Sequence, residues 1–401
     1  MTLRQDAHII ACISYAHACA HFSNLMLPVL FPAIRAATGY SWQELGWLMT
    51  AYFIVSGIAQ TGAGILVDRY GARRVLCLGL AALVLACCWL ARADSYPQML
   101  AGAMLAGLGN SVFHPADFTL LNRAISPARL GHAFSAHGLS GHLGWVAAPL
   151  YLLGVAHWSD WRTALAAAAL LPLLALLCVW RMPALHVPQA SSARQQGEGG
   201  QMWALLHNPA IWACFVFFLV TALALGGIQN FLIPALQQWQ GLSLLAANSC
   251  LTLYMAGSAC GMLLGGFLAG RSSGARAHER IVALAFGVAG TLACSIAFYR
   301  WSAFWLPLLL ALMGFCAGSA GPARDFLIRR AAPVQALGRV YGLVYGGLEL
   351  GFALAPLLFA AMLDHQHAQW MLLGVGLCQW LAIASAWWTG GRVLQVQPGR
   401  A

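Results

Sequence analysis

The sequence predicts an all-α integral membrane protein of twelve transmembrane helices, arranged as two pseudo-symmetric six-helix bundles. Three observations lead to this prediction. Of the 401 residues, 61% are hydrophobic and only 8% are charged, whereas soluble domains carry about 25% charged residues. Apolar runs of about 20 residues, the length that crosses a bilayer, recur along the whole chain. The second half of the chain also repeats residues of the first half.

The apolar runs are separated by short breaks of Gly, Pro and Arg. Each run is long enough to cross about 30 Å of hydrocarbon. Buried helices of a soluble protein do not fit, because the runs are too long and the loops between them are too short. The predicted spans are 9–34, 43–66, 75–93, 97–121, 131–155, 163–181, 209–235, 243–269, 281–299, 302–328, 336–362 and 370–390.

The arginines predict the orientation of these spans. The chain has 21 basic residues, all of them arginine, and a formal charge of +10. With the N-terminus inside, only Arg35, Arg92, Arg162 and Arg300 fall on the outer face, and the other seventeen face the cytoplasm. Basic residues concentrate on the cytoplasmic side of membrane proteins. We therefore predict a multi-pass protein of the inner (cytoplasmic) membrane with both termini in the cytoplasm, and we expect no nucleic-acid partner.

The longest polar stretch, roughly 183–208, is rich in Gln, Ser and Gly and follows the sixth predicted span. Its composition is typical of a flexible linker. The predicted organisation is a six-helix bundle at 1–182, a cytoplasmic linker at 183–208 and a second bundle at 209–401.

The two predicted bundles repeat each other in sequence. A shift of 207 positions aligns 115–150 with 322–357 without a gap. The identical positions include two prolines, two glycines and an arginine, which shared composition alone would not align. The pair Asn24 and Pro28 also recurs as Asn230 and Pro234. The twelve identical positions are Pro115, Ala116, Leu120, Arg123, Ala124, Leu130, Gly131, Leu143, Gly144, Ala148, Pro149 and Leu150.

Two parallel repeats joined by a cytoplasmic linker are typical of transporters with a substrate site between the halves. The loop after the second span has the sequence Gly64-Ile-Leu-Val-Asp68-Arg69-Tyr-Gly71-Ala-Arg73-Arg74. It resembles the signature loop of the major facilitator superfamily, and the chain resembles that family over essentially its whole length. The resemblance implies that Asp68 meets the N-terminus of the eleventh helix, near Gly338, and holds the inward side shut. A solvated loop would explain the arginines but not an acid between two glycines.

A narrower resemblance involves the fourth, fifth and first predicted helices. Residues 109–115 (GNSVFHP), 138–149 and His21-Phe-Ser-Asn24 resemble the fosmidomycin-resistance branch of the superfamily, which is associated with drug export. The chain departs from this branch at two positions. It has His142 where an asparagine is usual, and Asp117 lies beside the His-Pro pair.

Ionisable groups inside membrane spans are costly and are therefore functional candidates. The candidates for proton coupling are Glu349, His21, His114 and Asp117. The alternatives are interhelical hydrogen bonding for the histidines and Glu349, and an ion pair with Arg123 or Arg73 for Asp117. Glu349 is the most deeply placed acid and corresponds by repeat to His142. The candidates for the substrate cavity are His17, Asn24, Asn110, His137, His142, Asn230, Arg324 and Tyr345.

Further alternatives remain open for several of these residues. His17, His21, Asn24 and Pro28 form one stripe of a helix, at spacings of four, three and four. Such a stripe suits substrate binding, proton relay or contact with another helix. Arg324 could simply pair with its neighbour Asp325.

Histidines at depth also raise the possibility of transition-metal transport, because imidazole ligands suit copper. The predicted spans, however, contain no CxxC, MxxM or similar paired ligand motif. The sequence therefore leaves a metal site as a minor alternative, and none is predicted.

The sequence thus predicts a secondary active transporter that moves a small solute by alternating access. The favoured form is proton-coupled efflux of a drug or metabolite by a monomer in the lipid bilayer. The alternative is proton-coupled uptake of an organic acid, a siderophore-like compound or a nutrient. A membrane sensor would be expected to carry an additional soluble signalling domain, and a membrane enzyme is a lesser alternative. No cofactor is expected, and the chain lacks a GxxxxGK loop for ATP hydrolysis.

Overall fold

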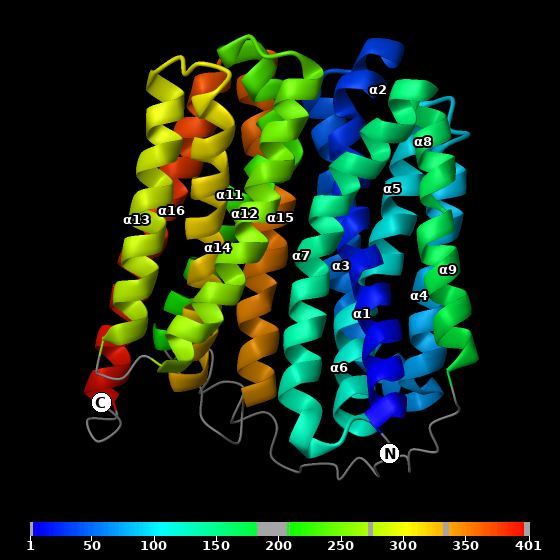
Figure 1. Ribbon diagram of the computed structural model, residues 1–401, viewed down its shortest axis with the longest axis vertical. Helices are drawn as coiled ribbons and strands as arrows, with labels where there is room; N and C mark the ends of the chain where they lie inside the picture. The colour runs from blue at the N-terminus through cyan, green and yellow to red at the C-terminus, as the bar shows by residue number, and fades with distance from the viewer. Residues whose placement is uncertain (1–2, 183–206, 208, 272–275, 332–336, 397–401) are drawn as a thin grey trace. The chain divides into compact units, whose positions relative to one another are not determined.

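A computed structural model describes residues 3–182, 207, 209–271, 276–331 and 337–396. All of the secondary structure in these ranges is helical (Figure 1). The helices are α1 (Leu3–Met26), η1 (Pro28–Leu30), α2 (Phe31–Thr38), α3 (Trp42–Tyr70), α4 (Ala72–Leu90), α5 (Tyr96–Asn110), α6 (Phe113–Ala124), α7 (Pro127–Trp158), α8 (Trp161–Ala168), α9 (Leu170–Arg181), α11 (Pro209–Gln240), α12 (Leu244–Arg271), α13 (Ala277–Phe298), α14 (Trp305–Ala331), α15 (Leu337–Asp364) and α16 (Ala368–Val396).

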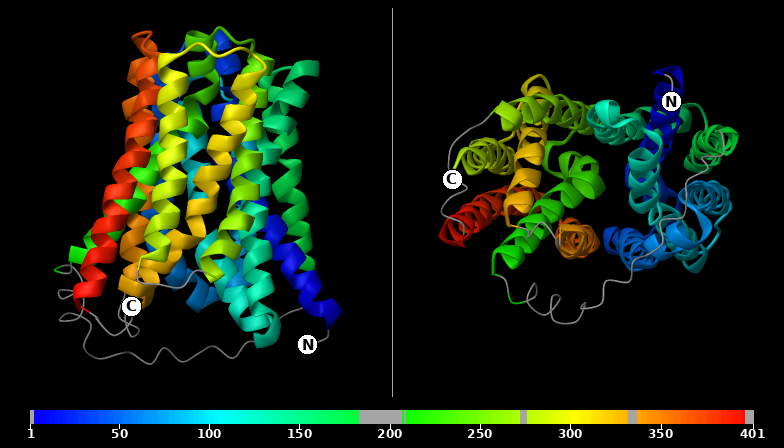
Figure 2. Two further views of the ribbon diagram at one scale, coloured as in Figure 1. Left: turned by 60° about the vertical axis from the view of Figure 1, so that its left-hand side comes forward. Right: turned by 90° about the horizontal axis from the view of Figure 1, so that it is seen from below.

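The chain divides into two compact units, Met1–Gln189 and Ala190–Ala401. In the first unit, α1 begins at the same end at which α9 finishes (Figure 1). In the second unit, α11 begins and α16 finishes at one end. Seen along the helices, each unit is a bundle (Figure 2). The predicted linker, 183–208, lies almost entirely outside the described residues, so the predicted domain boundaries stay a prediction.

The described residues contain eleven helical segments that are long and apolar enough to cross a membrane. The remaining predicted span, 97–121, is divided into α5 and α6 by a turn at Ser111 and Val112. Pro115 favours the break, because it has no N–H to donate to the carbonyl of Ser111. The break places Pro115 in the first turn of α6, where a missing N–H costs nothing. The all-helical, two-repeat fold class is confirmed, with the fourth span crossing as two shorter helices.

The connections at helix starts follow ordinary capping chemistry. Ser41 and Glu44 form a reciprocal capping box at the start of α3. Asp160 caps α8 by accepting a hydrogen bond from the backbone N–H of Thr163 at 2.7 Å. This backbone hydrogen bond lowers the pKa of the Asp160 carboxyl, because it favours the charged form.

Glycine allows neighbouring helices of the first unit to approach closely. A Cβ on Gly144 of α7 would overlap the carbonyl of Ala18 on α1, and a Cβ on Gly107 of α5 would overlap the carbonyl of Tyr52 on α3. Small residues at such crossings are typical of membrane helices, which associate by close packing. The α1–α7 crossing matters for function, because both helices carry candidate histidines.

The second unit has a longer contact of the same kind between α12 and α14. Gly257, Gly261 and Gly265 of α12 lie against the backbone carbonyls of Ala311, Phe315 and Ser319. In return, Gly314 and Gly318 of α14 lie against the carbonyls of Tyr254 and Ser258. Because five glycines interlock, the two helix backbones are almost in contact along this face.

Candidate functional site

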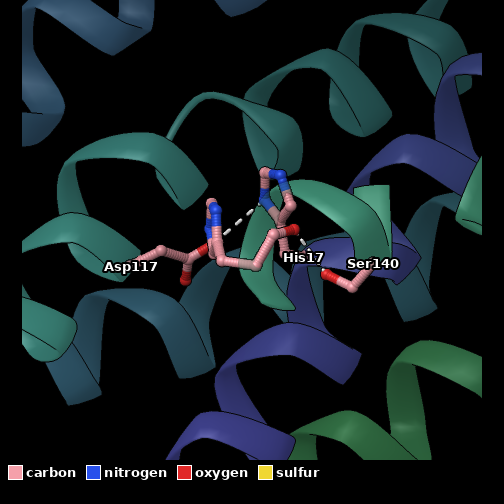
Figure 3. Close-up of polar contacts among 4 residues, drawn as sticks. His17, Asp117 and Ser140 are labelled. Atoms are coloured by element: carbon pink, nitrogen blue, oxygen red, sulfur yellow. Dashed lines mark hydrogen bonds and ion pairs between the residues drawn. The ribbon is translucent and has the colours of Figure 1, made fainter. Parts of the chain in front are cut away.

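The candidate residues of the first unit converge on Asp117, which is fully buried on α6. Its Oδ2 lies 3.1 Å from Nε2 of His137 on α7 and 3.2 Å from Nδ1 of His17 on α1. Only the contact with His137 has hydrogen-bond geometry. Figure 3 shows the carboxylate of Asp117 directed toward the His17 ring. Three helices thus bring together three candidates that lie up to 120 residues apart in the sequence (17 to 137).

Two further imidazoles surround this group. The ring centroid of His17 lies 3.7 Å from that of His137, 4.6 Å from that of His21 and 5.5 Å from that of His114. We call His17, His21, His114, Asp117 and His137 the histidine cluster. It gathers three of the four residues predicted for proton coupling, His21, His114 and Asp117, together with two predicted for the cavity.

Local structure explains why these side chains meet. On α1, His17 and His21 are four residues apart and therefore share a face. The break before α6 starts a new helix just ahead of His114 and Asp117, which lie on adjacent turns. Gly141 of α7 makes room for His21, since a Cβ there would lie 2.7 Å from Cε1 of its ring.

Trp145 links the cluster to His142. Its ring centroid lies 4.4 Å from that of His21 and 5.2 Å from that of His142. Nδ1 of His142 is 3.3 Å from the carbonyl of Gly138 on its own helix. His142 therefore lies one aromatic ring away from the cluster.

Two candidates of the first unit belong to a different polar network. Asn24 accepts a hydrogen bond from the hydroxyl of Tyr52 at 2.8 Å, and the same hydroxyl lies 2.8 Å from Oγ of Ser23. The amide of Asn110 donates to Oγ of Ser56 at 2.9 Å. Because the turn at 111–112 follows Asn110, this residue lies on α5, whereas His114 and Asp117 lie on α6. Both asparagines bind α3, and for Asn24 this is the contact with another helix considered from the sequence.

Asp117 is paired with histidines and not with the arginines considered as alternatives. Arg73 instead donates to the carbonyls of Val179 and Trp180 at the end of α9. Arg123 is exposed at the end of α6. The ion pair with Arg73 or Arg123 that was considered for Asp117 is therefore not observed, and its observed partners are His17 and His137.

The gating loop lies where α3 meets α4. Gly71 has φ of 88°, a backbone conformation that favours glycine, and it ends α3 and begins α4. Asp68 and Arg69 are exposed in the last turn of α3, and Gly64 has open space around it. A cavity of about 960 Å³ adjoins the loop and is lined by Asp68, Arg69, Arg73, Arg74, Arg123 and Trp180, among others.

In the second unit, the acid predicted from the sequence, Glu349, is half-buried midway along α15. Oε2 of Glu349 is enclosed and has no hydrogen-bond partner in the described part of the chain. Tyr345, one turn earlier, packs its ring 5.4 Å from that of Phe218. Arg324 lies outside the residues whose side chains the structure describes.

Asn230 and its neighbour Gln229 are both buried on α11, each 2% exposed. The amide of Asn230 donates to the carbonyl of Gly226 within its own helix at 2.7 Å. Gln229 was not a predicted site residue, yet neither polar atom of its side chain has a hydrogen-bond partner among the described residues. An amide inside an otherwise apolar span is the signal that could have identified it.

Comparisons with known proteins agree with this architecture. A family model described as Major Facilitator Superfamily matches residues 13–302 and 226–393. The fosmidomycin resistance protein of Escherichia coli K12 is 23% identical over 355 residues, covering 86% of this chain and 83% of that protein. The gallate transporter of Pseudomonas putida is 24% identical over 402 residues, covering 85% of each. A solved bacterial homologue of the human lysosomal transporter Spinster, in an inward-facing and unoccupied conformation, has a TM-score of 0.81 at 14% identity, covering 98% and 99% of the two chains.

The fold defines a polytopic helical membrane protein built from two units. The chain belongs to the major facilitator superfamily. The resemblance found in the sequence, including that to fosmidomycin resistance, is thereby confirmed. The protein is a multi-pass membrane protein that carries small solutes, and it is not an enzyme.

Proposed function

We propose that the protein is a proton-coupled exporter of a small organic solute, working by alternating access in the inner membrane. Efflux is favoured by the similarity to a fosmidomycin resistance protein over most of both chains. We further propose that it acts as a monomer with both termini in the cytoplasm, as the distribution of arginines indicates.

The observation that carries proton coupling is the enclosure of one carboxylate oxygen of Glu349, Oε2, midway along α15. A carboxylate oxygen enclosed within a membrane span has lost its water, so the group must be protonated or paired at some stage of the cycle. Oε2 of Glu349 has no hydrogen-bond partner within the described ranges. A group that alternates between a protonated, buried form and an ionised, hydrated form would carry one proton per cycle.

Uptake is the second candidate function. Its specific support is the similarity to a gallate transporter, which spans 85% of both chains. Glu349 would serve as the proton carrier in export or in uptake. The direction of solute transport depends on the order in which protons and solute bind, and not on which residue carries the proton. The gating role of Asp68 and the cavity roles of His17, His142, Asn230 and Tyr345 also stay predictions.

The test of Glu349 is the Glu349→Gln variant in proteoliposomes. Glutamine resembles the protonated acid but cannot release a proton. The variant should exchange solute for solute, and its transport rate with a pH gradient should equal its rate without one. Asp94→Asn, which changes an acid whose side chain is 83% exposed, should behave as wild type. Acceleration by a pH gradient in Glu349→Gln would eliminate Glu349 as the carrier.

A further inference from the structure

The core of the histidine cluster consists of metal-ligand types. His17, Asp117 and His137 are 3%, 0% and 3% exposed. The closest ligand atoms of the three side chains all lie within 4.8 Å of one another. Among the described residues, this is the single group of three or more His, Cys, Asp or Glu side chains with such spacing. No local sequence motif reveals it, because the three residues come from α1, α6 and α7.

The cluster contains polar atoms that nothing in the described structure satisfies. Oδ1 of Asp117 is buried and has no hydrogen-bond partner there, and the same is true of Nδ1 of His21. Nδ1 of His17 is near Oδ2 of Asp117 but is not aligned with it for a hydrogen bond. Buried polar atoms in proteins are nearly always paired, so unpaired ones gathered in one place call for a partner, either water or an ion.

Two of the three distances between the ligand atoms suit a metal ion. Two atoms that each lie about 2.1 Å from one ion are roughly 3.0–3.4 Å apart when they subtend about 90–109° at it. The two distances from Oδ2 of Asp117 to the imidazole nitrogens are 3.1 and 3.2 Å. Two imidazoles and one carboxylate are preferred by borderline divalent ions such as Zn²⁺, Co²⁺, Ni²⁺ and Cu²⁺.

The surroundings of the three residues also fit an ion. A buried carboxylate needs a positive charge beside it, and the ion-pair partners of Asp117 among the described residues are both histidines. The ring centroid of His21 lies 4.6 Å from that of His17. His21 is therefore near enough to support or complete the coordination after a small rotation. The His21 ring lies where a Cβ on Gly141 would otherwise stand, so this glycine allows the ring to approach the cluster.

We propose that His17, Asp117 and His137 bind one divalent transition-metal ion inside the first unit. This assigns Asp117 to metal binding, where the sequence favoured a gate ion pair or proton coupling. The site is independent of the direction and coupling of transport, because all of its ligands lie in one unit and its occupancy is a property of the purified protein.

The test is metal binding by the full-length protein in detergent. The protein is purified with an affinity tag that contains no histidine, stripped with a chelator, incubated with Zn²⁺ and desalted. Bound zinc is measured by elemental analysis, and Co²⁺ is used in parallel because its absorption spectrum reports nitrogen and oxygen coordination. The wild type should retain one ion per chain, and the ion should raise its unfolding temperature.

The variants are His17→Ala, His137→Ala and the nearly isosteric Asp117→Asn. Each should weaken Zn²⁺ binding at least about tenfold, since loss of even a supporting partner typically costs 10–100-fold. His132→Ala is the matched control, because His132 is an exposed histidine of α7 outside the cluster. It should bind as wild type. Asp117→Asn keeps the shape of the side chain, and its unfolding temperature without metal shows whether it is folded.

Two results would overturn the proposal. One is a wild-type protein that retains no zinc and gives no Co²⁺ spectrum. The other is binding by folded His17→Ala and His137→Ala that equals the wild type, which would place the ion elsewhere. Transport measurements do not enter, so failure here is distinguishable from failure of the proton-coupled export proposed above.

Discussion

Asp6 ties the start of α1 to the start of α7. Its carboxylate is fully buried, and Oδ2 accepts hydrogen bonds from Nε of Arg129 at 2.8 Å and from Oγ of Ser126 at 3.1 Å. A second guanidinium nitrogen lies 2.7 Å away. Both guanidinium nitrogens thus contact the same oxygen, Oδ2, and charge-assisted contacts of this kind are stronger than neutral hydrogen bonds. The pair therefore fixes the end of the same two helices that carry His17 and His137.

Loss of Arg129 should accordingly destabilise the first unit. Arg129→Ala leaves a buried carboxylate without its cation, which is more harmful than loss of both groups. Thermal unfolding in detergent should show a lower midpoint for Arg129→Ala than for Arg123→Ala, whose arginine is exposed. The unfolding midpoint of the double variant, Asp6→Asn with Arg129→Ala, should fall by less than the sum of the two decreases in the single variants. If the two decreases simply add in the double variant, the ion pair contributes nothing to stability.

At the residue scale, the sequence identified the individual groups but not their partners. Asp117 and the deep histidines stood out because ionisable residues are rare in membrane spans. Their mutual distances depend on how α1, α6 and α7 cross, and no spacing within one helix encodes that. The arginines near Asp117 in the sequence were therefore plausible partners, whereas His17 and His137 are the observed ones.

At the scale of helices, the interlocking of α12 and α14 is the feature most open to test. Gly257, Gly261 and Gly265 recur every four residues, which places them on one face of α12. Because the atoms opposite them are backbone carbonyls, the neighbour cannot yield by rotating a side chain. The glycine spacing is visible in the sequence, but the identity of the partner helix is not.

Gly261→Ala should separate these two helices. Its Cβ would overlap the carbonyl of Phe315, and overpacking of this kind typically costs about 1–3 kcal/mol. Gly266→Ala on the same helix is the control, since its Cβ would lie 4.0 Å from the nearest atom, Cγ of Pro322. Gly261→Ala should lower the midpoint of thermal unfolding, and Gly266→Ala should leave it unchanged. Equal midpoints would mean that the crossing has room that the structure does not show.

The broken fourth span shows that the effect of a proline on a helix depends on its surroundings. The apolar pattern predicted a continuous helix over 97–121, and Pro115 lies inside that range. Elsewhere the chain tolerates such prolines, since Pro149, Pro234 and Pro356 lie within continuous helices. The different outcome at Pro115 depends on tertiary contacts, because Gly79 of α4 lies directly against Val112 and the carbonyl of Gly109.

At the scale of the whole molecule, the predicted topology can be tested by cysteine labelling. Ser159 is exposed in the connection between α7 and α8, and Gln196 belongs to the predicted linker, outside the described residues. Ser159→Cys should react with a membrane-impermeant maleimide added to intact cells, and Gln196→Cys should react only after lysis. The unaltered chain measures the background from its own cysteines. Labelling of Gln196→Cys in intact cells would invert the predicted orientation.

The fold could be predicted almost completely, since hydropathy, repeat and loop signature all depend on local sequence. The functional site could be predicted only in part. Glu349 was identified as a deep acid, and its mid-helix position on α15 agrees with that. Gln229 escaped notice because a neutral amide is a weak signal beside charged groups, although its burial without a hydrogen-bond partner in the described chain is as unusual.

The most direct test of proton-coupled transport follows protons and solute together. Purified protein is reconstituted into liposomes that contain a pH-sensitive dye, and candidate solutes including fosmidomycin and gallate are added outside. Proton-coupled export predicts antiport, so entry of a transported solute should drive protons out and make the interior more alkaline, and only in liposomes that contain the protein. Acidification of the interior would contradict export and establish uptake by symport, and solute entry without any change in internal pH would contradict proton coupling itself.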